Sequence, residues 1–201
     1  IAMAEAQAAE SPPAAGRIQK IGGIFGRFGL ASLSSAVVSV SHLLVQLFSI
    51  HHLGTSGIGV LAFLLVIIQF GYSLSNALVS TPYTIAVNQE EEVAAGAHDF
   101  FFPVNLLLCL SQGLTCAIVA WVMASPAAAL VFGIAGTLSL VRWFGRSNAY
   151  AHHAPMRAAR SDFAYAATIL IGLLVASRTG ADLAGIGAII LLAGLVGMLC
   201  F

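Results

Sequence analysis

The sequence predicts an all-α integral membrane protein, a bundle of about six transmembrane helices. The chain of 201 residues is 59% hydrophobic and only 8% charged, whereas soluble domains carry about 25% charged residues. Its mean hydropathy is +0.96. Long runs without Asp, Glu, Lys or Arg recur along the chain. Because about 20 residues of helix cross a hydrocarbon core roughly 30 Å thick, these runs have spanning length.

The chain is expected to begin with a cytoplasmic tail that precedes the bundle. Residues 1–20 are rich in Ala and polar residues, which is typical of a disordered segment. The bundle is expected over residues 21–201. Its first two spans are predicted at Phe28–Ile50 and Gly57–Val79, which contain no charged residue and are joined by a short polar connection. Pro82 is expected to end or kink the second span, because proline lacks a backbone donor.

Four further apolar runs complete the six predicted spans. The fourth run is short, and the flanking Arg142 and Trp143 are expected to extend it by reaching the interface. Residues 142–162 are polar and basic, which predicts a loop between the fourth and fifth spans. The four runs are Phe100–Ala124, Ala127–Val141, Phe163–Ser177 and Leu183–Phe201.

Lysine and arginine fall almost entirely on one side of this six-span topology. Three lie in residues 17–27 and four in residues 142–162, both on the side of the N-terminus, and only Arg178 lies on the other side. Because cytoplasmic loops carry an excess of Lys and Arg, the N-terminus is predicted to be cytoplasmic. The formal net charge of the chain is zero, which predicts no nucleic-acid partner.

Motifs typical of enzymes or metal sites do not occur in the sequence. The three cysteines, Cys109, Cys116 and Cys200, lie in apolar runs without metal-ligand spacing and are interpreted as packing residues. The paired histidines are poor metal ligands, because neighbours on a helix point about 100° apart. No nucleophile elbow or Walker loop is found. The sequence therefore predicts a protein that is not an enzyme, with no catalytic residue, cofactor or metal.

Polar residues at helical spacing run along the first three predicted spans. Such side chains normally face the bundle interior or a water-filled cavity. For any single one of these residues, an interhelical hydrogen bond, worth only about 0.6 kcal/mol on average, is the better explanation. Three stripes together favour a hydrated translocation cavity. The candidate cavity-lining residues on the substrate path are His42, Gln46, Gln69, Asn76, Asn105 and Gln112.

Two segments carry a resemblance to a known family. The first has a Leu-Gly turn over residues 53–59 between two spans, followed by Pro82. The second has Arg142, Tyr150-Ala151 and the run Ala159-Arg160-Ser161-Asp162 after the fourth span. In these features the chain resembles the N-terminal part of polysaccharide flippases of the multidrug/oligosaccharidyl-lipid/polysaccharide exporter superfamily.

This resemblance implies one six-helix lobe of a two-lobe exporter, which fits a chain that begins at Ile1 and stops inside an apolar run. The implied function is to move a lipid-linked saccharide or polysaccharide precursor across the inner (plasma) membrane by alternating access. Membrane lipid and envelope polysaccharide assembly proteins are the implied partners. Arg27 and Arg142 are the candidates for binding the substrate anion or lipid phosphate.

Three alternatives remain open at this point. A drug or cation antiporter of the same superfamily needs an intramembrane acid, and none is expected within the six spans. A non-transporting membrane scaffold subunit needs no continuous polar cavity. An integral membrane enzyme would have only Glu90–Glu92, His98 and Asp99 as candidate acids and bases, and their spacing fits no known geometry.

Overall fold

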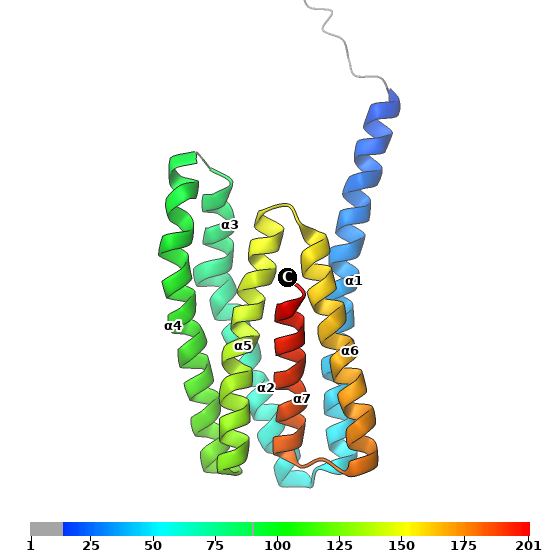
Figure 1. The fold of residues 1–201 in the computed structure, drawn as a ribbon, viewed down its shortest axis with the longest axis vertical. Helices are drawn as coiled ribbons and strands as arrows, with labels where there is room; N and C mark the ends of the chain where they lie inside the picture. Colours follow the sequence, from blue (N-terminus) through cyan, green and yellow to red (C-terminus); the bar gives the residue numbers. More distant parts are fainter. Residues whose placement is uncertain (1–13, 90) are drawn as a thin grey trace, which may run out of the picture.

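The computed structural model describes residues 14–89 and 91–201, and the side chains of 29–89 and 96–201 (Figure 1). All regular structure in these ranges is helical, which confirms the predicted all-α fold class. The elements in chain order are α1 (Ala14–His52), α2 (Thr55–Ser75), the π-helical turn η1 (Asn76–Ser80), α3 (Thr81–Val87), α4 (Glu91–Met123), α5 (Pro126–Ala151), α6 (Pro155–Thr179) and α7 (Leu183–Leu199).

Within the described residues, five helical segments are long and apolar enough to cross a membrane. The sixth predicted span corresponds to α7, which is apolar but has only 17 residues. Five such helices indicate a multi-pass membrane protein. The segments are Gly29–His52, Thr55–Val87, Gly96–Met123, Pro126–Ala151 and Pro155–Thr179.

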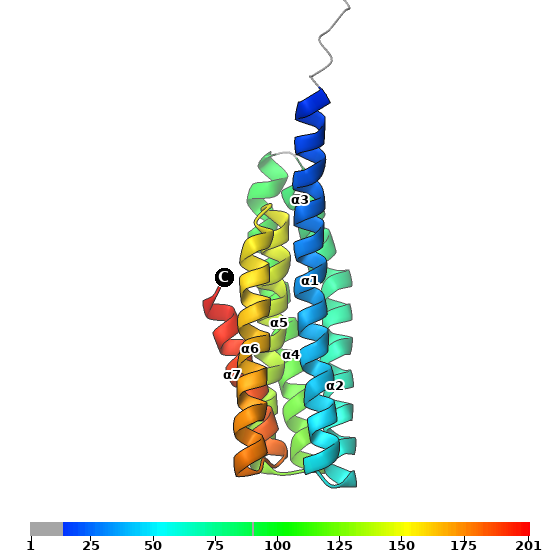
Figure 2. The same ribbon diagram turned by 90° about the vertical axis from the view of Figure 1, so that its right-hand side faces the viewer.

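The helices run side by side as an elongated bundle (Figures 1 and 2). The α1–α2, α4–α5 and α6–α7 connections lie at one end, and the α3–α4 and α5–α6 connections lie at the other. Although α1 and α2 follow each other in the chain, α1 packs mainly on α6 and touches α2 only slightly. The most extensive helix pair is α4 with α5, and α7 packs on both α5 and α6.

Small residues explain why α4 and α5 pack so closely. A Cβ added to Gly133 would lie 3.0 Å from the Cβ of Ala117, and one added to Gly136 would lie 3.0 Å from the Sγ of Cys116. Glycine and alanine let two helix backbones approach each other, which is how transmembrane helices associate without a hydrophobic driving force between them. Both thiols predicted to be packing residues of this span, Cys109 and Cys116, are fully buried.

Pro82 does not end the second span. The helix continues without interruption from Thr55 to Val87, and η1 ends two residues before Pro82. In η1 the backbone N–H of Thr81 donates to the carbonyl of Asn76, five residues earlier, which widens the turn. Such a local π adjustment accommodates a proline, which lacks an N–H and whose ring clashes with the preceding turn.

The prediction of a loop over residues 142–162 is wrong. Helix α5 continues to Ala151 and α6 begins at Pro155, so the connection is only three residues long and includes His153 at φ 56°. The basic residues at the end of α5 are tolerated in a helix because they find a buried partner, described below. At the N-terminus, α1 begins at Ala14, inside the predicted tail 1–20, and residues 1–13 lie outside the described part of the chain.

Candidate functional site

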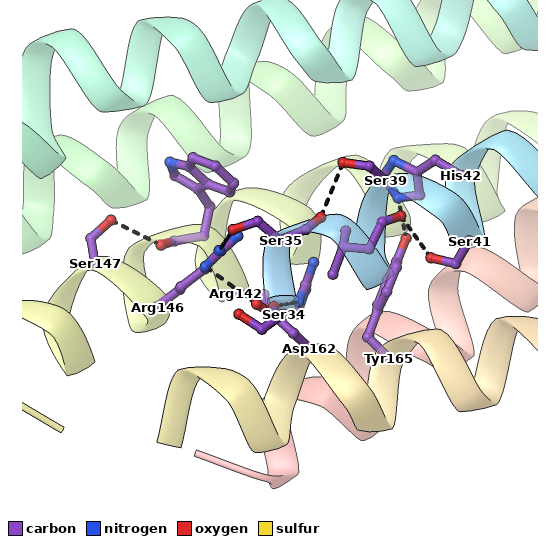
Figure 3. A network of polar contacts seen from close by, with 12 residues as sticks. Ser34, Ser35, Ser39, Ser41, His42, Arg142, Arg146, Ser147, Asp162 and Tyr165 are labelled. Carbon is purple, nitrogen blue, oxygen red and sulfur yellow. Dashed lines mark hydrogen bonds and ion pairs between the residues drawn. The ribbon is translucent and has the colours of Figure 1, made fainter. Parts of the chain in front are cut away.

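Three charged side chains meet inside the bundle between α5 and α6 (Figure 3). Arg142 and Arg146 are four residues apart on α5 and therefore share one helix face. Arg142 Nη1 donates to Asp162 Oδ1 of α6 at 2.9 Å, and Arg146 Nε lies 3.4 Å from Asp162 Oδ2. The Asp162 side chain is fully buried, and those of Arg142 and Arg146 are 4% and 11% exposed. We call these three residues the charged cluster.

A glycine on α7 makes room for the charged cluster. A Cβ added to Gly197 would lie 3.0 Å from Arg142 Cδ and 3.3 Å from the carbonyl oxygen of Ser161. Any side chain at this position would press on the arginine stem or on the α6 backbone. The small-residue pattern of α7 thus has a specific consequence here, because it lets the buried arginine lie between α5, α6 and α7.

The charged cluster is connected to α1 at two places (Figure 3). Arg146 Nη2 donates to Ser35 Oγ. The Arg142 guanidinium lies 4.1 Å from the ring centroid of Tyr165, a cation–π arrangement, and the Tyr165 hydroxyl is 2.8 Å from Nε2 of His42. Polar side chains therefore link α1, α5 and α6 across the bundle.

The cluster carries more positive than negative charge, since two guanidinium groups share one carboxylate. Several donors near it also lack a hydrogen-bond partner among the described residues, although they are buried: Arg142 Nε, Trp143 Nε1 and the Tyr150 hydroxyl. The Arg146 guanidinium lies 5.4 Å from the Trp143 ring and 5.7 Å from the Tyr150 ring. A buried polar group without a partner costs about 1–3 kcal/mol. The unpaired groups also include Oδ2 of Asp162 and Oγ of Ser161, so a preference for an anionic ligand rests on the two guanidinium groups that share one carboxylate.

The structure brings two of the six candidate cavity-lining residues together. Gln46 of α1 and Gln69 of α2 line a cavity of about 330 Å³ between these helices, with Ser49 and apolar residues forming the rest of its wall. Both glutamines are exposed in the isolated chain. His42 lies on the same helix as Gln46 but faces Tyr165 of α6.

The other three candidates do not join this cavity. Gln112 donates from Nε2 to the carbonyl of Ile67 at 3.0 Å, where Gly71 leaves room for it, so it makes a buried contact between α2 and α4. Asn105 is buried, donates weakly to the Sγ of Cys109 at 3.5 Å, and has an unpaired Oδ1. Asn76 is exposed at the start of η1.

Of the two candidate anion-binding arginines, Arg142 is buried between α5, α6 and α7, and its Nη1 donates to Asp162. The side chain of Arg27 lies outside the described residues. Arg146, Asp162 and Tyr165 are site residues that the sequence did not identify. The signal for them was present, because Asp162 and Tyr165 are three apart and thus share one helix face, as Arg142 and Arg146 do.

Within the described part of the chain, no three His, Cys, Asp or Glu side chains come together in a group that could hold a metal ion. Comparison of the chain with protein-family models, curated proteins and solved structures found no match.

Proposed function

We propose that this protein is a membrane transporter that moves an anionic, lipid-linked saccharide or polysaccharide precursor across the inner (plasma) membrane by alternating access. The observation that supports this most directly is the charged cluster, with two arginines, one carboxylate and unpaired donors inside helices of spanning length. Ionisable residues within transmembrane segments are rare and commonly mark substrate or ion pathways. The saccharide part of the proposal rests on the sequence resemblance alone.

Arg146 is the residue we assign to the anion. Arg142 forms the close ion pair with Asp162 and lies over Tyr165, so its charge is compensated. Arg146 is farther from the carboxylate and donates to Ser35, a neutral hydroxyl that a phosphate oxygen can replace. Arginine suits this role because its planar fork of donors matches phosphate geometry.

The same proposal includes the orientation of the chain. The end of the bundle that holds the α5–α6 connection carries Arg146, Arg157 and Arg160, whereas Arg178 lies near the α6–α7 connection at the opposite end. This asymmetry supports a cytoplasmic position for the N-terminus and for the charged cluster's end of the bundle.

Replacing Arg146 by Gln is expected to slow transport by about tenfold or more, because a hydrogen bond to a charged group contributes about 1.5–3 kcal/mol. The measurement uses the protein in proteoliposomes with a fluorescent polyprenyl-diphosphate disaccharide as the probe. Loss of fluorescence to an impermeant quencher reports the fraction moved between leaflets.

The matched control for this experiment is Arg157→Gln, which removes an exposed arginine from the first turn of α6. Its transport rate is expected to equal that of the unchanged protein. Equal rates for Arg146→Gln and the unchanged protein, with both folded, would contradict the assignment of Arg146. Absence of movement in the unchanged protein would contradict the proposed substrate class.

A second candidate function is a drug or cation antiporter, which needs an acidic residue within a span. Asp162 is such a residue, because the fifth candidate span begins at Pro155 and not at the predicted Phe163. Two arginines compensate this carboxylate, however, so it offers a cation less than an uncompensated acid does. The proteoliposome assay separates the two functions when a lipophilic cation replaces the saccharide probe. A non-transporting scaffold would move neither probe.

A further inference from the structure

Gln46 and Gln69 present two amides to the same cavity. This cavity of about 330 Å³ lies between α1 and α2, and both residues belong to segments of spanning length. Neither amide makes a hydrogen bond to another group in the part of the chain that the structure describes. A polar group in hydrocarbon without a partner is costly, so such side chains face a water-filled cavity or a ligand. The two glutamines therefore need a hydrogen-bonding occupant.

The lining of the cavity determines which kind of ligand fits it. An amide both donates and accepts hydrogen bonds and carries no charge. The remaining wall is largely apolar, with Ile58, Leu61 and Leu65 of α2 among its residues. Among these lining residues a phosphate would find no cation, and an organic cation would find no carboxylate. A neutral group with hydroxyls at its edge and an apolar face matches the cavity, and a sugar ring is such a group.

A chain of contacts connects the cavity to the charged cluster. Gln69 and Tyr72 are three residues apart on α2 and so share one helix face. The ring of Tyr72 stacks on that of Trp143 at 4.8 Å, and the Arg146 guanidinium lies 5.4 Å from the Trp143 ring. The cavity and the proposed anion-binding arginine are therefore neighbouring parts of one region between α1, α2 and α5.

Helix α1 sets the distance between these two parts. Ser35, which accepts from Arg146, and Gln46 are eleven residues apart. Eleven residues make about three turns, so the two side chains share one face and are separated by about 16 Å along the helix axis. A first sugar ring attached to a phosphate at Arg146 stays close to that arginine. The second or a later ring is the part of the substrate that reaches the cavity.

We propose that the cavity between α1 and α2 is a saccharide subsite, in which Gln46 and Gln69 bind the second or a later sugar of a substrate whose phosphate is held at Arg146. This inference rests on the proposed function and deepens it, because it assigns residues to the saccharide and predicts its length. The site favours substrates that carry at least two sugars. The two amides determine this preference through hydrogen bonds to sugar hydroxyls.

Competition binding in detergent micelles, read by native mass spectrometry, tests the proposal without transport. Three probes differ only in their sugars: polyprenyl diphosphate, and the same lipid carrying one or two sugars. The disaccharide probe is expected to bind the native chain about tenfold more tightly than the other two, because it gains two neutral hydrogen bonds. The two shorter probes are expected to bind alike.

The double variant Gln46→Met, Gln69→Met removes both amides with little change in side-chain length or helix propensity. Its preference for the disaccharide is expected to disappear. Its affinity for the sugar-free probe is expected to equal that of the native chain, which also shows that the variant is folded. Each single variant is used if the double variant does not fold. Gln89→Met is the matched control, because Gln89 is exposed beyond the end of α3, and it is expected to keep the native preference.

Three results would overturn the proposal. One is equal affinity of the native chain for all three probes, which would mean that the cavity holds water only. Another is a monosaccharide probe that binds as tightly as the disaccharide. The third is a disaccharide preference that persists in the double variant. Failure of the proposed function is distinguishable from these, because it appears as an Arg146→Gln variant that binds the sugar-free probe as tightly as the native chain, or as absence of movement in proteoliposomes.

Discussion

Replacing Asp162 by Asn is expected to destabilise the protein by about 3–5 kcal/mol, the usual cost of removing one partner of a buried ion pair. The substitution leaves Arg142 and Arg146 buried without a carboxylate, and their side chains are 4% and 11% exposed. The asparagine oxygen still accepts a hydrogen bond, so the loss reports mainly the uncompensated charge. The measurement is the free energy of unfolding from an SDS titration in mixed micelles.

The control for charge removal is Asp182→Asn. Asp182 is the N-cap of α7, where its Oδ1 accepts from the backbone N–H of Gly185 at 2.8 Å. Asparagine caps a helix about as well as aspartate, so little change is expected. If Asp162→Asn were as stable as Asp182→Asn, the two buried arginines would need compensation from another source, and the charged cluster as described would be wrong.

Replacing Gly113 by Leu is expected to be the most damaging single change at the α4–α5 contact. Even a Cβ at this position would overlap the Thr137 Oγ1 and lie 2.7 Å from the carbonyl oxygen of Gly133. The second neighbour is backbone and cannot rotate away, so the two helices must separate. Overpacking of this kind typically costs about 1–3 kcal/mol, and more where backbone must move. A lower midpoint in the same SDS titration measures it.

The matched glycine control is Gly59→Ala in α2, where a Cβ would meet no atom within 4 Å. There alanine is expected to be neutral or to stabilise the helix by about 0.5–1 kcal/mol, because it reduces the backbone entropy lost on folding. Gly113→Ala is the milder test at the contact itself. A Gly113→Ala variant as stable as Gly59→Ala would contradict the close approach of α4 and α5.

Helix positions were largely predictable, because a membrane-spanning helix needs only a long uncharged run, and such runs are visible in composition. The ends of the helices were not. Helix α5 extends ten residues beyond the predicted end at Val141, to Ala151. A hydropathy pattern assigns Arg142 and Arg146 to water. It cannot show that their charges are paired with Asp162, which follows Arg142 by twenty residues.

The candidate site was predicted only in part. Arg142 was predicted as a candidate anion-binding residue. In the structure it is the ion-pair partner of Asp162, which lies on α6, a helix that packs against α5. The polar residues of the first three predicted spans lie on helical segments. Which neighbour each face meets was not predictable from spacing: Gln46 meets the α2 cavity, His42 meets α6, and Gln112 meets the α2 backbone.

The sequence by itself determined the all-helical class, the apolar segments and the asymmetry of basic residues, because each depends on local composition and on the thickness of a bilayer. Only the tertiary structure decided that α1 packs on α6 instead of α2, and that Arg142, Arg146 and Asp162 share one buried cluster. The physical reason is that an ion pair between helices costs desolvation for each charge and is stable only when packing brings all partners together. Packing of that kind joins residues distant in the chain, and no local pattern records it.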